Sequence, residues 1–140
     1  PTSDLETICR RDVASIAADD SVLLLWVPMS MLPDGLTVMA RWGFAYASGN
    51  VWVKDRIGLG RWFRTRHEML LLGTRGNPPC PAPGTQWESV ITAPPGRHSE
   101  KPANYYALIE SYFPTLPKIE LNARTARPGW DVWGNEAEGG

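Results

Sequence analysis

A dense group of hydrogen-bonding side chains lies near the end of the sequence. Arg124 comes first, and Asn135 and Glu136 stand side by side further along. An amide next to a carboxylate matches the two adjacent hydroxyls of a ribose. The alternative is a turn or a C-terminal cap, and the residue types leave both interpretations open. We expect Trp130 and Trp133 to anchor the turn that leads to the Asn-Glu pair.

The segment 54–67 combines basic and aromatic side chains. Arginine and lysine neutralise phosphates, and aromatic rings stack on bases, so the combination is typical of nucleic-acid contacts. The alternative is a solvated basic hairpin whose tryptophan lies in the core. The candidate contacts are Lys54, Arg56, Arg61, Trp62, Phe63, Arg64, Arg66 and His67.

Lys101 precedes a predicted helix, where an ammonium group and free helix amides could hold a carboxylate or phosphate together. A solvated lysine is the alternative. His98 has no serine or cysteine partner in a recognisable arrangement, so the sequence does not support a nucleophilic triad. Cys9 and Cys80 lie far apart and outside any Cys/His ligand spacing, which argues against a zinc site.

Length and composition predict one domain with a packed core, because the chain has 140 residues and is 43% hydrophobic. The formal net charge is −1, so nucleic-acid binding would depend on a local basic patch. The longest apolar run, 22–27, is far shorter than the roughly 20 residues of a membrane span, and no signal peptide is recognisable. We expect a single domain over residues 1–140, located in the cytoplasm and without a membrane partner.

Hydrophobic periodicity and breaker residues predict an α/β fold with a mostly parallel sheet and flanking helices. The continuous apolar run after Ser21 indicates a strand covered on both faces, and with the next helix and strand it predicts a βαβ unit. The expected helices are 4–17 with Ser3 as its cap, 33–42, and 102–113. The expected strands are 21–28, 44–53, 68–74 and 118–121, and 76–95 is expected to be a proline-rich loop.

Several sequence blocks, taken in order, resemble the MT-A70 family of S-adenosylmethionine-dependent adenine-N6 methyltransferases. The blocks are VLLLWV, WGF, VWVKDRIGLGRWFRTRHEMLLLGTRGNPP, APPGRHSEKP, KIEL-x-AR and RPGWDVWGNE. They extend over nearly the whole chain, to about residue 136. The resemblance implies a Rossmann-like methyltransferase fold in the permuted, beta-class order, with its N-terminal part missing here. It also implies S-adenosylmethionine as the cofactor and nucleic acid as the partner, DNA more than RNA, with a homodimer or heterodimer open.

The resemblance implies roles for particular residues. For the cofactor, Lys101 would meet the methionine end, and Arg124 would lie near the ribose. Asn122 stands where the family carries a phenylalanine against the adenine. Asn135 and Glu136 would hold the ribose and adenine. For the nucleic acid, Glu68 would lie near the target adenosine, and the receiving segment would include Lys54, Arg61, Trp62, Arg64, Arg66 and His67.

The family's catalytic motif, Asp-Pro-Pro-Trp, does not occur between Pro1 and Gly140. The pairs Pro78-Pro79 and Pro94-Pro95 lack the preceding Asp, and the motif is expected upstream of Pro1. We therefore assign no catalytic residue within this chain. Two alternatives remain: a non-catalytic nucleic-acid-binding paralogue that serves as a scaffold subunit, and a plain Rossmann-like domain whose basic loop serves protein contacts.

Overall fold

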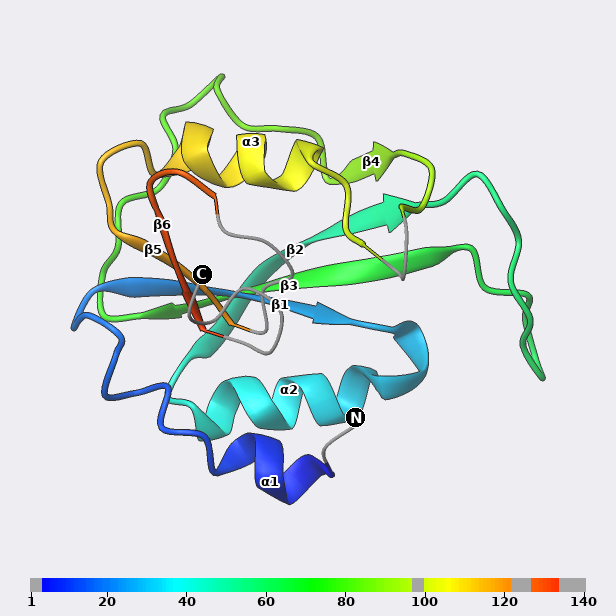
Figure 1. Cartoon of the computed structure of the whole chain (residues 1–140), viewed down its shortest axis with the longest axis horizontal. Coiled ribbons are helices and arrows are strands. Elements are labelled where there is room, and N and C mark those ends of the chain that lie inside the picture. Colours follow the sequence, from blue (N-terminus) through cyan, green and yellow to red (C-terminus); the bar gives the residue numbers. More distant parts are fainter. Residues whose placement is uncertain (1–3, 97–99, 122–126, 134–140) are drawn as a thin grey trace. The chain divides into compact units, whose positions relative to one another are not determined.

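The computed structural model describes residues 4–96, 100–121 and 127–133 (Figure 1). The chain forms two compact units, Pro1–Tyr106 and Ala107–Gly140, and each is described by itself. No helix among the described residues is long and apolar enough to cross a membrane. A single domain over residues 1–140 stays a prediction.

The first unit is built on a four-stranded sheet in the order β1-β3-β2-β4. Its strands are β1 (Ser21–Val27), β2 (Ala45–Val53), β3 (His67–Arg75) and β4 (Val90–Thr92). Strand β3 runs antiparallel to both β1 and β2, and β4 is parallel to β2. The sheet is therefore mixed, which corrects the expectation of a mostly parallel sheet.

The correction has a simple cause. Strands β2 and β3 are joined by the hairpin connection 54–66, and strands joined in this way are antiparallel. Strand β3 then lies between β1 and β2, so these two run parallel without touching. The predicted βαβ unit is present as a split unit. An apolar run indicates that a strand is covered on both faces, but it does not indicate whether the adjacent strand is parallel or antiparallel.

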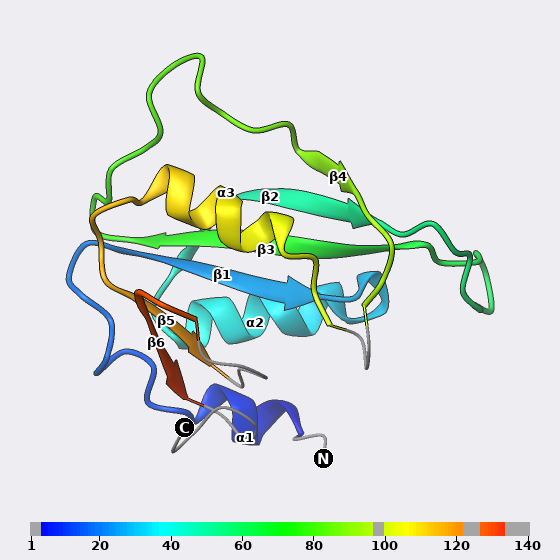
Figure 2. The ribbon, with the colours of Figure 1, turned by 45° about the horizontal axis from the view of Figure 1, so that its top comes forward.

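One face of the sheet is covered by α2 (Leu32–Arg41), and α1 (Leu5–Cys9) packs against α2, as Figures 1 and 2 show. A Cβ on Gly73 of β3 would stand 2.7 Å from Sδ of Met39, which is almost fully buried at 1% exposure. The two helices are tied together by the Trp42 indole N–H, which donates to the Ile8 carbonyl over 3.1 Å. The close approach of α2 to the sheet thus depends on glycine at position 73 of β3.

The expected helix 4–17 is wrong in length and in its cap. Helix α1 has five residues, and Asp4 caps it by accepting from the Thr7 amide at 2.8 Å. Val13 is buried from a turn that follows the helix, so its apolar character reflected burial and not a helical stripe. The predicted cap Ser3 lies outside the described residues.

Helix α2 agrees closely with its prediction because both of its ends carry strong local signals. Pro33 lies in the first turn, where the missing amide costs nothing. The helix ends at Arg41, and Gly43 then takes a φ of 90°, which lets the chain reverse toward β2. A 3-10 turn, η1 (Met29–Met31), connects β1 to this helix.

Strand β4 lies inside the segment that was expected to be loop. It pairs with the end of β2, with Val51 opposite Val90. The Asn50 side-chain amide also donates to the Glu88 carbonyl over 2.8 Å. The strand has only three residues between proline-rich stretches, so its formation depends on pairing with β2.

The second unit contains a two-stranded parallel sheet of β5 (Lys118–Leu121) and β6 (Trp130–Trp133). Helix α3 (Asn104–Tyr112) begins in the first unit and continues into the second. Pro114 follows the end of the helix, as expected. Strand β6 was expected to be a turn, and its register with β5 begins at Lys118 opposite Trp130.

Candidate functional site

Two lysines share one carboxylate on the sheet face opposite α2. The Lys54 ammonium lies 2.8 Å from Glu68 Oε2, and the Lys101 ammonium lies 2.7 Å from Glu68 Oε1. Glu68 is 14% exposed, while Lys54 and Lys101 are 28% and 32% exposed. Lys54 directly follows β2, Glu68 lies near the start of β3, and Lys101 lies in the segment before α3. We call them, with Trp26 and Trp52, the Glu68 cluster.

Two tryptophans form the floor of the Glu68 cluster. Trp52 is directly opposite Glu68 in the β2–β3 register, so both side chains project from one face. It is fully buried, and its indole N–H donates to the Ala93 carbonyl over 2.9 Å. Trp26 meets it edge-on at a centroid distance of 6.0 Å. The floor is thus held by packing and by a hydrogen bond.

The lysines also lie over this floor. The Lys54 ammonium is 5.0 Å from the centroid of the Trp52 ring. The Lys101 ammonium is 5.3 Å from Trp26 and 5.7 Å from Trp52. Cations within about 6 Å of an indole centroid are attracted by the ring quadrupole. Each ammonium group is therefore placed by two kinds of contact.

The cluster keeps its carboxylate charged. Burial raises the pKa of Glu68, but hydrogen bonds and charges from Lys101 and Lys54 lower it more, so the pKa lies below its ordinary value. Two ammonium groups and one carboxylate leave one net positive charge. A site with this charge attracts an anionic group such as a carboxylate or a phosphate.

A tyrosine extends the cluster. The Tyr105 hydroxyl donates to Asn50 Oδ1 over 2.7 Å, and the Tyr105 ring meets Trp26 edge-on at 4.7 Å. Burial raises the pKa of Tyr105 to about 12, so the hydroxyl keeps its proton at neutral pH. Asn50 is in turn fixed by its bond to the Glu88 carbonyl.

An open pocket of about 410 Å³ lies beside the Glu68 cluster. The charged groups at its wall are those of Lys54, Glu68 and Lys101, and the wall also includes the polar residues Thr65 and His67. Residues of the hairpin connection 54–66 form another wall. The complete lining is Pro28, Lys54, Gly58, Leu59, Thr65, His67, Glu68 and Lys101. The pocket therefore joins the charged cluster to the basic and aromatic segment.

The hairpin connection extends away from the sheet beyond the ends of β2 and β3 (Figures 1 and 2). Its neck is braced by the Lys54 amide, which donates to the Arg66 carbonyl over 2.8 Å. The Arg66 guanidinium donates back to the Lys54 carbonyl at 3.1 and 3.3 Å. A Cβ on Gly58 would come within 2.9 Å of the Thr65 carbonyl oxygen, so the tight crossing needs glycine there.

The tip of the hairpin connection exposes three large apolar side chains. Leu59 is 92% exposed, and Trp62 and Phe63 are each 86% exposed. The alternative of a core Trp62 is thereby wrong. Arg61 and Arg64 flank these rings and form no hydrogen bond or ion pair with any other residue that the structure describes. Guanidinium groups and aromatic rings are thus both exposed at the tip.

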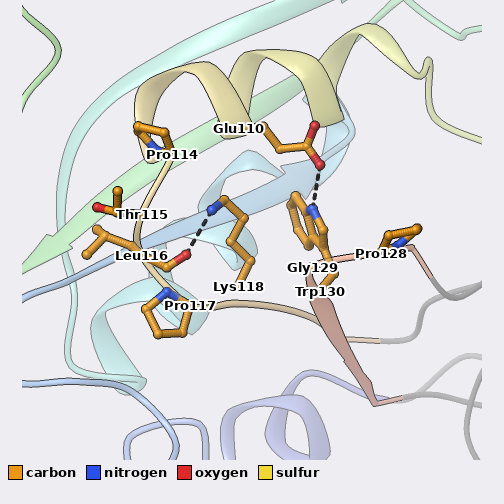
Figure 3. Close-up of a pocket in the computed structure, with 9 residues that line it drawn as sticks. All are labelled: Glu110, Pro114, Thr115, Leu116, Pro117, Lys118, Pro128, Gly129 and Trp130. Carbon is orange, nitrogen blue, oxygen red and sulfur yellow. Dashed lines mark hydrogen bonds between the residues drawn. The ribbon is translucent and has the colours of Figure 1, made fainter.

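A second polar cluster lies in the second unit and lines a pocket of about 470 Å³ (Figure 3). Glu110 of α3 accepts two hydrogen bonds from Arg127, at 2.8 and 3.0 Å, and one from the Trp130 indole at 2.8 Å. The Trp130 amide also donates to the Arg127 carbonyl over 3.0 Å. Pro128 and Gly129, the latter with a φ of 83°, occupy the central positions of this turn.

These contacts explain the arginine and tryptophan that the sequence concentrates near its end. The pKa of Glu110 is lowered to about 2, first by its hydrogen bonds from Arg127 and then by that from Trp130. The carboxylate is therefore charged at neutral pH and fixes the start of β6. The expectation that Trp130 anchors the chain here is confirmed, although it begins a strand. Nothing is described of the Trp133 side chain.

The structure brings together four of the predicted site residues and places four others outside the pocket that they line. Lys54, His67, Glu68 and Lys101 line one pocket. Arg61, Trp62 and Arg64 lie on the exposed tip, and Arg66 braces its neck. Four predicted cofactor residues lie outside the described residues, namely Asn122, Arg124, Asn135 and Glu136.

Sequence reasoning did not single out Trp26, Trp52, Asn50 or Tyr105. A usable signal was present for Trp52, because it alternates with apolar residues in a strand that leads directly to Lys54. Among residues 4–96, 100–121 and 127–133, no group of three His, Cys, Asp or Glu side chains is placed to hold a metal ion.

The chain is similar to known proteins over nearly its whole length. The MT-A70 family model matches residues 2–136. The chain belongs to the MT-A70 family. It is 35% identical over 137 residues to the Type II methyltransferase M.MunI of a Mycoplasma species, which covers 97% of this chain and 59% of that protein.

Similarity to eukaryotic MT-A70 proteins is nearly as high. The chain is 32% identical over 140 residues to the human N(6)-adenosine-methyltransferase catalytic subunit METTL3, which covers 93% of this chain and 24% of that protein. It is also 32% identical to the N(6)-adenosine-methyltransferase MT-A70-like protein of Drosophila melanogaster. The chain thus spans 59% or less of the length of these three relatives. Membership of the MT-A70 family implies a Rossmann-like fold, which fits the mixed α/β sheet.

Proposed function

We propose that this protein is an adenine-N6 methyltransferase, which transfers a methyl group from S-adenosylmethionine to the exocyclic amine of adenine in nucleic acid. The observation that carries the proposal is the pocket shared by the Glu68 cluster and the hairpin connection. The family match over residues 2–136 and the names of the relatives as methyltransferases support the chemistry.

The described residues fit one end of the proposed cofactor. S-adenosylmethionine supplies an electrophilic methyl group and carries a free amino-acid carboxylate. An ammonium group has three donors, and the one that Lys101 directs to Glu68 can be redirected to a carboxylate ligand. Lys101 lines an open pocket whose charged groups sum to one positive charge, so a carboxylate finds both donors and a favourable field. The proposed roles of Asn122, Arg124, Asn135 and Glu136 at the ribose and adenine stay predictions.

The hairpin connection suits the other substrate. An adenine in a duplex has to be flipped out, or else be single-stranded, before its amine can be reached. Arg61 and Arg64 are free to meet phosphates, and Trp62 and Phe63 are exposed to stack on bases. Methyl transfer then depends mainly on alignment of the amine with the methyl carbon. Glu68, in the lining of the pocket, would meet the target adenosine.

We favour DNA over RNA because the chain matches the bacterial Type II methyltransferase at 35% identity over 97% of its length. The test uses the product of the complete gene with isotopically labelled S-adenosylmethionine and matched DNA and RNA oligonucleotides. Digestion and mass spectrometry should then show N6-methyladenine in DNA. Methylation of RNA alone would overturn the substrate preference. Cofactor and nucleic-acid binding without product would favour the scaffold paralogue.

A further inference from the structure

Lys54 differs from Arg56, Arg61 and Arg64 of its segment, which are exposed. Its side chain turns inward, with the ammonium 2.8 Å from Glu68 Oε2 and 5.0 Å from the Trp52 centroid. Its side chain is 28% exposed, whereas that of Arg56 is 79% exposed. A half-buried lysine that already pairs with a carboxylate is poorly placed for a phosphate contact at the tip.

Lys101 has support that does not depend on Glu68. Its ammonium lies over two indole rings, at 5.3 Å from Trp26 and 5.7 Å from Trp52. These contacts would keep the ammonium in place while its hydrogen bond is exchanged for one to a ligand carboxylate. Lys101 also lines the open pocket, so a ligand can reach it.

The exchange would cost Glu68 one of its two partners. A carboxylate that is 14% exposed is expensive to leave without a counter-charge. Lys54 binds the other carboxylate oxygen, Oε2, so it would remain paired with Glu68 throughout. Lys54 therefore offsets the cost of releasing Lys101 to a ligand.

We propose that Lys54 is a positioning residue for a carboxylate-bearing ligand, and that it acts by holding Glu68 while Lys101 binds the carboxylate. The inference rests on the proposed function, in which this ligand is the cofactor with its amino-acid end. Lys54 itself touches neither the cofactor nor the reacting atoms. Replacement of Lys54 should weaken the binding only of ligands that carry the carboxylate.

Binding of two nucleosides distinguishes this role from a general effect of the substitution on the fold. S-adenosylhomocysteine and 5′-methylthioadenosine share the adenosine and the thioether, but only the former has the amino-acid end. Calorimetry on the complete gene product should show that Lys54→Met lowers the affinity for S-adenosylhomocysteine about tenfold. This is the scale of one hydrogen bond to a charged group. Binding of 5′-methylthioadenosine should change less than about twofold on the same scale. Lys54→Arg should restore most of the affinity. Arg10→Met, at a basic residue that is 75% exposed and does not line the pocket, is the matched control.

A double-mutant cycle tests whether Lys54 acts through Glu68. In a Glu68→Gln background the carboxylate is gone, so Lys54→Met should no longer change the ratio of the two affinities. A ratio that still changes would mean that Lys54 contacts the ligand directly, and this would overturn the inference. The inference would also be overturned if Lys54→Met lowered the affinities for both nucleosides equally, or if it left the affinity for S-adenosylhomocysteine unchanged.

Thermal unfolding of each variant is measured in parallel, and Lys54→Gln replaces Lys54→Met if the latter fails to fold. Wild-type protein that binds neither nucleoside would contradict the proposed function itself, and the inference would fall with it. Wild-type protein that binds both, with no selective effect of Lys54, would contradict the inference alone.

Discussion

The Trp130 indole N–H donates to Glu110 Oε2 over 2.8 Å, so a residue of α3 holds the first residue of β6. The same carboxylate accepts two hydrogen bonds from Arg127, at the other end of the turn. Glu110 thus fixes the start of the strand that leads to the predicted cofactor residues Asn135 and Glu136.

This relationship predicts how stability depends on acid. The pKa of Glu110 is about 2 in the folded protein and close to its ordinary value, 4.5, when unfolded. A lowered carboxyl pKa stabilises the fold above pH 4.5, and the stabilisation is lost as pH falls toward 2. Glu110→Gln should therefore lower the urea midpoint at pH 7, and the gap from wild type should narrow between pH 4.5 and 2. Ser111→Ala, on the next residue, is the control, and a gap that does not depend on pH would contradict the assignment.

Tyr105 should respond at the opposite end of the pH scale. Its pKa is raised to about 12 by burial, whereas an unfolded tyrosine ionises near 10. The unfolded state therefore loses its proton first, and stability contributed by Tyr105 falls as pH rises from 10 to 12. Tyr105→Phe should remove this dependence and cost about 1 kcal/mol at pH 7 through the lost bond to Asn50. Tyrosinate absorbance against pH measures the ionisation, and Tyr46→Phe, at an exposed tyrosine, is the control.

Gly73 should tolerate no larger residue unless Met39 is shortened. A Cβ at Gly73 would stand 2.7 Å from the Met39 sulfur, and Met39 is 1% exposed and has little room to move. Gly73→Ala should cost about 1–3 kcal/mol of unfolding free energy by overpacking. The double variant Gly73→Ala/Met39→Ala should lose less unfolding free energy than the two single variants lose together. Chemical denaturation of the three variants measures this difference. Strict additivity would mean that the clash is relieved elsewhere.

The sequence predicted the elements whose signals are local. Helix α2 is bounded by Pro33 and Gly43, and both act through their own backbone. Strands β4 and β6 were missed because each forms by pairing with a strand that is distant in sequence. The direction of β3 was also missed, since an apolar run is the same for parallel and antiparallel neighbours.

The site was predictable in its members but not in its assembly. Lys101 and Glu68 were each singled out, partly through the family resemblance, yet they are 33 positions apart and nothing local indicates a 2.7 Å contact. The tryptophan floor was missed because the sequence around a buried tryptophan does not indicate whether apolar side chains or a charged pair pack against it. Trp52 does both, being fully buried and 5.0 Å below the Lys54 ammonium.

The tip of the hairpin connection offers two kinds of nucleic-acid contact that salt should separate. Arg64 is exposed and would neutralise a phosphate, whereas the 86% exposed ring of Trp62 would stack on a base. Binding of a fluorescent single-stranded oligonucleotide to the complete gene product is measured by anisotropy at several salt concentrations. Arg64→Ala should reduce the slope of log affinity against log salt by about 0.7, the single-strand value per phosphate.

Trp62→Ala should act differently on the same plot. Loss of one stacked base costs about 1–3 kcal/mol of binding free energy, and it releases no counterion. The affinity should therefore fall at every salt concentration while the slope stays at the wild-type value. Val90→Ala, at an exposed apolar residue of β4 outside the hairpin connection, is the matched control. Wild-type slopes and affinities in both tip variants would mean that the tip binds no nucleic acid, and a protein partner would then be the better explanation of its exposed rings.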